Sequence, residues 1–131
     1  MFIFNYEIKP EDINEGKHVG NERALLFFQY ARTAFLKQYG LSQLNLGDNI
    51  GLIQTNAYIE YLNQLFLGNE IAVKINNIQI DGLNLIFDYS ITCENKVAIK
   101  GYTTMLCYDY PAQKVKKIPK SLLTILKKGS N

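Results

Sequence analysis

Apolar and polar positions alternate along most of the chain, and one long segment interrupts this alternation with a helical pattern. Alternation predicts β-strands, here at residues 2–8, 52–61, 71–80, 83–93 and 97–108. The parity of the apolar positions shifts at Asn76-Asn77, which predicts a β-bulge there. Asp81-Gly82 separates two alternating runs and predicts a tight hairpin turn.

The pattern of apolar and polar residues from Glu22 to Tyr39 predicts a single long helix. Asn21 is the expected N-cap, and Gly40 followed by Leu41 predicts a Schellman-type end. Apolar side chains cover most of the circumference of this helix, whereas a helix packed on one side needs an apolar stripe of only about 100°. We therefore expect the helix to be enclosed on several sides. A second, short helix is expected from Pro119 to Lys128.

A helix apolar nearly all round must be wrapped by the sheet that the remaining strands form. This predicts an α+β fold in which a curved antiparallel sheet surrounds a central helix, in a single domain over residues 1–131. Such a sheet has open edges and a spare face, so we expect two or more copies of the chain to associate.

Composition excludes several classes of protein. The sequence is 47% hydrophobic, 20% charged and carries a formal net charge of +2, which does not indicate a nucleic-acid-binding protein. The longest apolar run, Ala24 to Phe28, is far shorter than the roughly 20 residues that cross a bilayer. Cys93 and Cys107 form neither a disulfide framework nor a zinc site. We expect a soluble, cytoplasmic protein without a structural metal, in which both cysteines are inert core thiols.

The polar segment before the long helix reads Asp12-Ile13-Asn14-Glu15-Gly16-Lys17-His18-Val19-Gly20-Asn21. Together with the order of elements, it resembles the loop of hot-dog-fold acyl-CoA thioesterases related to 4-hydroxybenzoyl-CoA thioesterase. Further similarities are Tyr30-Ala31-Arg32, Leu67-Gly68-Asn69-Glu70, Lys100-Gly101-Tyr102-Thr103-Thr104 and Lys117-Ile118-Pro119. The resemblance extends over nearly the whole chain and implies a hot-dog fold, a homodimer or homotetramer, and hydrolysis of acyl-CoA or acyl-carrier thioesters. It implies no cofactor, because coenzyme A would be part of the substrate.

One departure from the family pattern matters for the chemistry. The thioesterases carry their catalytic carboxylate four residues before the histidine, and this position is Asn14 here. An amide does not accept a proton at neutral pH. The resemblance therefore implies that Asn14 and His18 position water and the substrate carbonyl, with Glu15 as the candidate base. Asp12 is the other nearby carboxylate, and we expect it to brace the loop.

Substrate binding is expected at Gly20, Asn21, Tyr58 and Lys117. Gly20 permits a close approach of the substrate carbonyl to the helix start, where unpaired N–H groups favour a developing oxyanion. An apolar channel along Phe27, Phe28 and Tyr58 would hold the acyl or aryl group.

The C-terminal region contains six of the fourteen cationic residues. They are Lys114, Lys116, Lys117, Lys120, Lys127 and Lys128. They would attract the phosphates of coenzyme A, or simply form the solvated, dipole-compensating side of a terminal helix.

Two other functions stay open. Asn14 is also compatible with a non-catalytic module that binds or senses acyl-CoA. A hydratase or dehydratase acting on an enoyl thioester is the third interpretation, although it would need an acid on the helix where Gln29 provides an amide.

Overall fold

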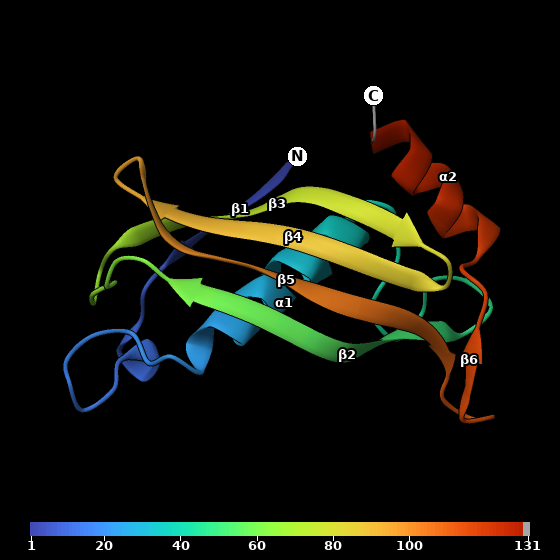
Figure 1. Cartoon of the computed structure of the whole chain (residues 1–131), viewed down its shortest axis with the longest axis horizontal. Helices are drawn as coiled ribbons and strands as arrows, with labels where there is room; N and C mark the ends of the chain where they lie inside the picture. The colour runs from blue at the N-terminus through green and yellow to red at the C-terminus, as the bar shows by residue number, and fades with distance from the viewer. Residues whose placement is uncertain (130–131) are drawn as a thin grey trace.

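The computed structural model describes residues 1–129, and it has the expected alternation of strands around a long helix (Figure 1). The strands are β1 (Phe2–Glu7), β2 (Ile50–Tyr61), β3 (Glu70–Asp81), β4 (Asn84–Cys93), β5 (Lys96–Asp109) and β6 (Lys114–Lys116). The helices are α1 (Arg23–Lys37), α2 (Lys120–Gly129) and the 3₁₀ turn η1 (Pro10–Asp12). Strand β6 and the turn η1 were not expected from the sequence.

All strands belong to one antiparallel sheet in the order β1-β3-β4-β5-β2. The short strand β6 pairs with residues 107–109 at the end of β5, beyond the last residue of β5 that pairs with β4. Strands β1 and β2 are therefore the two edges of the five-stranded order.

Three register shifts interrupt the pairing of the sheet. The bulge predicted at Asn76-Asn77 is confirmed by a register shift between Ile75 and Asn77. Two further shifts, between Gln54 and Asn56 in β2 and between Ile91 and Thr92 where β4 pairs with β5, were not predicted. An extra residue reverses the faces of the strand that follows it, so side chains after Thr55 face opposite to their expected direction.

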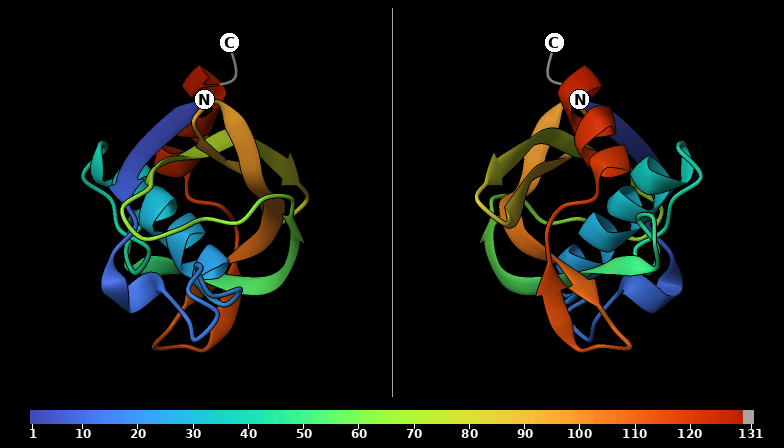
Figure 2. Two further views of the ribbon diagram at one scale, coloured as in Figure 1. Left: turned by 90° about the vertical axis from the view of Figure 1, so that its left-hand side faces the viewer. Right: turned by 90° about the vertical axis from the view of Figure 1, so that its right-hand side faces the viewer.

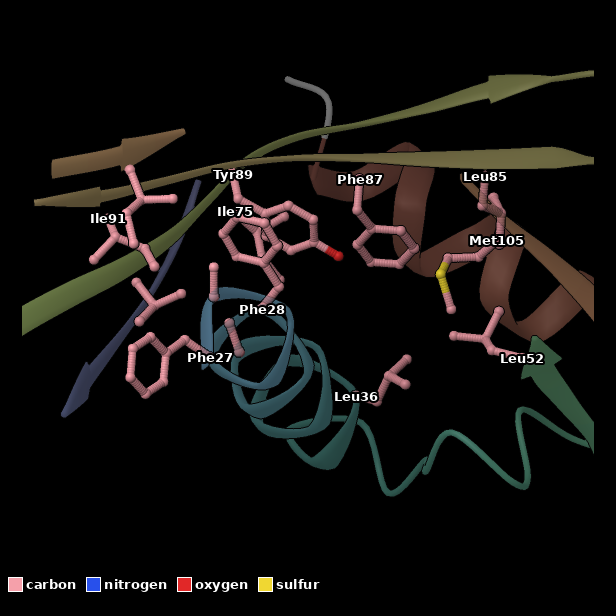
Figure 3. Packing of buried hydrophobic residues seen from close by; sticks show 14 of the residues in the cluster. Phe27, Phe28, Leu36, Leu52, Ile75, Leu85, Phe87, Tyr89, Ile91 and Met105 are labelled. Atoms are coloured by element: carbon pink, nitrogen blue, oxygen red, sulfur yellow. The ribbon is translucent and has the colours of Figure 1, made fainter. Parts of the chain in front are cut away.

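The sheet curves around α1, as the two end-on views show (Figure 2). Phe27 and Phe28 are fully buried, and the ring of Phe28 stacks on that of Tyr89 with 4.1 Å between centroids (Figure 3). One stripe of the helix, however, is exposed at Leu25, Gln29, Thr33 and Lys37. The expected enclosure on several sides is thus incomplete within one chain.

The end of α1 follows the predicted Schellman geometry. Gly40 has a φ of 72°, the N–H of Leu41 donates to the Leu36 carbonyl at 3.0 Å, and the Gly40 N–H donates to Lys37 at 3.1 Å. Positive φ suits glycine because it has no Cβ.

The middle of α1 is attached to the sheet by Arg32, which is 4% exposed. Its Nη1 donates to the Tyr89 hydroxyl at 2.9 Å and its Nε to Gln43 Oε1 at 3.0 Å. The Tyr89 hydroxyl in turn lies 2.7 Å from Thr103 Oγ1. These neutral partners satisfy buried polar atoms that water does not reach.

The described cysteines are both free, and Cys107 is fully buried. Burial raises the pKa of the Cys107 thiol to about 11, which keeps it protonated and unreactive at neutral pH. Within residues 1–129, no helix has the length and apolarity needed to cross a bilayer.

Candidate functional site

The polar segment before α1 folds into a tight hairpin. Ile13 and Val19 form an isolated antiparallel bridge, and the Asn14 N–H donates to the His18 carbonyl at 2.9 Å. Asn14 Oδ1 accepts the N–H of Gly16 at 2.9 Å, which is the local turn that asparagine favours. The loop is therefore held by its own backbone, with His18 leading out of the hairpin.

A buried carboxylate attaches this hairpin to the helix. Asp12 is 1% exposed, and its Oδ1 accepts Nε and Nη2 of Arg23 at 2.9 and 2.6 Å. Its Oδ2 accepts the Tyr6 hydroxyl at 2.7 Å and the Lys9 N–H at 2.9 Å. Burial alone would raise the pKa of Asp12, but these hydrogen bonds and the charge of Arg23 outweigh it and hold the pKa below its ordinary value. The predicted bracing role of Asp12 is confirmed.

A cleft of about 400 Å³ lies between the hairpin and the segment that follows β2. The Val19 N–H donates to the Leu65 carbonyl at 2.8 Å and joins these two segments. The lining residues are His18, Val19, Gly20, Asn21, Tyr61, Leu62, Asn63, Gln64, Leu65 and Ile99. Three of the predicted site residues, His18, Gly20 and Asn21, therefore come together.

His18 is half-buried, and its Nδ1 lies 3.0 Å from the carbonyl oxygen of Val19. Because a carbonyl only accepts hydrogen bonds, Nδ1 carries a proton in this arrangement, and in the neutral imidazole Nε2 is then an acceptor. A Cβ added at Gly16 would lie 3.0 Å from His18 Nε2 and 3.2 Å from Asn14 Oδ1, so these two atoms flank the same point of the hairpin.

The predicted capping role of Asn21 is wrong. No side chain in the described part of the chain caps α1, and the residue at the cap position is Glu22, in helical backbone conformation. The Asn21 carbonyl instead accepts the Tyr61 hydroxyl at 2.6 Å. Among residues 1–129, nothing accepts a hydrogen bond from the backbone N–H of Asn21 or of Glu22. The start of α1 thus presents unpaired donors beside the cleft.

Glu22 is a functional candidate that the sequence analysis did not single out. Its two carboxylate oxygens lie where a Cβ on Gly20 would project, one of them 2.7 Å from that position. Burial raises the pKa of the Tyr61 hydroxyl, and the negative charge of Glu22 raises it further. The Glu22 side chain is exposed and does not line the cleft, but its carboxylate lies beside two residues that do, Gly20 and Tyr61.

The remaining predicted residues lie elsewhere. Glu15 is exposed at the tip of the hairpin and does not line the cleft. Tyr58 is 48% exposed, stacks on Tyr102 and donates to Glu60 at 2.7 Å. The unpredicted bulge at Thr55 places Tyr58 on the outer face of the sheet, away from Phe27 and Phe28. The predicted acyl channel along these three residues is consequently not formed within one chain.

Lys117 follows β6, at the opposite end of the molecule from the hairpin (Figure 1). Strand β6 pairs beside the start of β2, whereas Tyr61 at the end of β2 lines the cleft. At about 3.3 Å per residue, a strand of this length separates the two by on the order of 30 Å. Lys117 and His18 of one chain therefore do not contact the same small molecule.

Comparison with known proteins identifies the class. The family described as the thioesterase-like superfamily matches residues 8–126, and the chain belongs to this family. Acyl-CoA thioester hydrolase YbgC of Escherichia coli is 22% identical over 129 residues, which cover 97% of this chain and 96% of YbgC.

Two solved structures share the fold. A hypothetical protein of Aquifex aeolicus superposes with a TM-score of 0.88 at 23% identity, covering 96% of this chain and 99% of its own. A 1,4-dihydroxy-2-naphthoyl-CoA thioesterase from Synechocystis superposes with a TM-score of 0.86 at 20% identity, covering 99% and 98%. The predicted hot-dog α+β fold and the predicted thioesterase family are both confirmed.

Proposed function

We propose that the protein hydrolyses an acyl-CoA thioester to the free acid and coenzyme A at the cleft beside His18. Membership of the thioesterase-like superfamily supports the reaction class. The position of the proposed active site is supported by the uncapped start of α1. Its N–H groups at Asn21 and Glu22 lie beside a cleft that contains the single histidine of the chain.

The residues of the cleft match the demands of this reaction. Attack on a thioester carbonyl places negative charge on its oxygen, and backbone N–H groups at a helix start stabilise that charge. Nε2 of His18 accepts a hydrogen bond and orients the attacking water. The Asn14 amide accepts no proton, so its role is to shape the hairpin around Gly16.

The proposal includes a homodimer formed through the open edge of β2. This strand is twelve residues long, and the nearby side chains of Tyr61, Leu62 and Phe66 are 48–50% exposed. If two copies pair antiparallel along β2, the start of one strand lies beside the end of the other. The partner subunit's Lys117 would then approach the cleft of this chain and meet the phosphates of coenzyme A.

Mixed subunits test this arrangement. Alone, His18→Ala and Lys117→Ala proteins are each expected to be impaired. A heterodimer of the two contains one site with both residues intact, so mixing should restore activity. The dimer would be contradicted if the mixture showed only the sum of the low rates of the two variants and if analytical ultracentrifugation gave the mass of a monomer.

The activity itself is tested by thiol release. Purified protein is incubated with short-chain, long-chain and aromatic acyl-CoAs, and free coenzyme A is titrated with a thiol reagent beside His18→Ala and Asn14→Ala variants. We expect release from at least one class, a large loss with His18→Ala and a smaller loss with Asn14→Ala. Absence of release from every substrate would count against hydrolysis.

The second candidate is a module that binds acyl-CoA without turning it over. Asn14, in the position of the usual carboxylate, favours it. Tight binding by calorimetry without thiol release, unchanged by Asn14→Asp, would support this function in place of the first. Either function agrees with a cytoplasmic location, which cell fractionation tests.

A further inference from the structure

Thioester hydrolysis by water requires a group that removes a proton from the water, and the chain must supply it from a position other than Asn14. Asp12 is unsuitable because four hydrogen bonds from Arg23, Tyr6 and Lys9 already occupy its oxygens. Glu15 is exposed and lies outside the cleft lining.

Glu22 is exposed and is not itself one of the residues that line the cleft, which is also true of Glu15, but its carboxylate lies beside residues that do line it. Its oxygens lie against Gly20, one of the buried lining residues, and its charge acts on the hydroxyl of Tyr61, another lining residue. In contrast to Asp12, its carboxylate accepts no hydrogen bond and forms no ion pair with any residue from 1 to 129. Its lone pairs are therefore available to a water molecule in the cleft.

The position of Glu22 also relates the carboxylate to the oxyanion donors. The backbone N–H of Glu22 is itself one of the two unpaired groups at the start of α1. A substrate carbonyl that approaches these N–H groups over Gly20 brings its carbon close to the carboxylate. The donors that stabilise the oxyanion and the acceptor that activates water thus come from the same turn of the chain.

We propose that Glu22 is the general base of this thioesterase, in place of the carboxylate that Asn14 lacks; the assignment rests on the proposed hydrolysis. The Glu22 carboxylate takes one proton from water while the water oxygen bonds to the thioester carbon, and the carbonyl electron pair moves to the oxygen. The tetrahedral intermediate then re-forms the carbonyl and breaks the C–S bond. The departing thiolate of coenzyme A takes the proton from Glu22, and the product acid ionises in water.

The first test removes the carboxylate and then replaces it from solution. We expect Glu22→Gln to lower kcat about 10²- to 10⁴-fold, the usual contribution of a positioned base, and Glu22→Asp to retain part of the activity. Glu22→Ala should regain activity as formate is added, because a small carboxylate fits the vacated space, whereas formamide should have no effect. Glu11→Gln, a neutralised exposed acid of the same polar segment, is the matched control with unchanged kcat.

A double-mutant cycle separates chemistry from simple obstruction. Gly20→Ala places a methyl group where the Glu22 oxygens lie, and the flexible side chain must move away. If Gly20→Ala acts by displacing the base, it lowers kcat in the wild-type background and causes little further loss in Glu22→Gln. An equal loss in both backgrounds would show that the methyl group blocks the substrate and would count against the assignment.

The outcomes distinguish this inference from the function on which it rests. A wild-type protein that releases no thiol overturns both. A wild-type protein that turns over, with Glu22→Gln equally active or with Glu22→Ala unaffected by formate, overturns only the role of Glu22. Binding of a non-hydrolysable thioether analogue, measured by calorimetry, should be unchanged in Glu22→Gln, and its loss would reassign Glu22 to substrate binding.

Discussion

The two ends of α1 differ in whether their backbone polar groups are paired within the protein. At its C-terminal end, the glycine cap pairs the carbonyls of Leu36 and Lys37, and the side chain of Leu36 is fully buried. At its N-terminal end no side chain of residues 1–129 caps the first turn, two N–H groups are unpaired, and a carboxylate lies uncompensated beside a cleft. Exposed polar groups without protein partners add little to stability but remain available to a substrate. The comparison therefore separates an end that stabilises the fold from an end that can do chemistry.

The largest effect on stability is expected at the C-terminal end of α1. Leu36 is fully buried, so Leu36→Ala removes apolar contacts and leaves a cavity, which should lower the free energy of unfolding by about 3 to 4 kcal/mol. Urea denaturation measures the loss. The activity per folded molecule should be unchanged, because the reactive groups lie at the other end of the helix. A fall in kcat as large as that of the base variants would show that the two ends are not separable.

A slightly smaller effect is expected where the hairpin joins the helix. Asp12→Asn leaves Arg23 without its counter-charge and should lower the free energy of unfolding by about 2 to 3 kcal/mol. Unlike Leu36→Ala, it should also lower kcat, since Asp12 holds the hairpin that carries His18. Retained activity in a destabilised protein would show that the hairpin keeps its place without this carboxylate.

The same carboxylate gives the stability a defined pH dependence. Because the pKa of Asp12 is lowered in the folded protein, its contribution is present above the unfolded value of about 3.9 and is lost as pH falls through the lower folded value. The wild-type protein should therefore lose stability below about pH 4. The difference between it and Asp12→Asn should shrink over that range in urea titrations. A constant difference from neutral to acid pH would contradict this account.

The smallest effect is expected at the N-terminal end of α1, on the pKa of Tyr61. The charge of Glu22 contributes to the raised pKa of Tyr61, after burial. Glu22→Gln should therefore lower the pKa of Tyr61 toward its ordinary value, which the ring ¹³C shifts report in an NMR titration. The exposed control Glu11→Gln should leave it unchanged. An unaltered Tyr61 titration in Glu22→Gln would separate the two side chains and weaken the placement of Glu22 at the cleft.

The sequence was most informative where a local pattern alone determines the structure. Strand alternation, the Asp81-Gly82 turn, the parity shift at Asn76 and the glycine after α1 each reflect interactions between near neighbours. The bulge at Thr55 carries no comparable signal, because the residues around it are polar on both faces. Without it, the sequence analysis placed Tyr58 on the inner face of the sheet and predicted a channel that is not formed within one chain.

The candidate site was predicted in part for a similar reason. The hairpin and His18 were recognisable because their spacing resembles a known loop. Glu22 has no such signature, since an acidic residue at a helix start is ordinarily explained by the helix dipole. Its relation to Tyr61 depends on β2 passing the start of α1, which a pattern read along the chain does not contain.

The buried guanidinium of Arg32 has a consequence for the reactive turn. It binds the helix to Tyr89 in the sheet and to Gln43 in the connector. If α1 slid along its axis by one residue, these contacts would part where water cannot replace them. Arg23 precedes Arg32 by nine residues, or about 14 Å of helix. The alignment of the N-terminal end of α1, where we place the proposed active site, is thus set by a buried anchor, so substitutions at Arg32 should lower activity without touching that site.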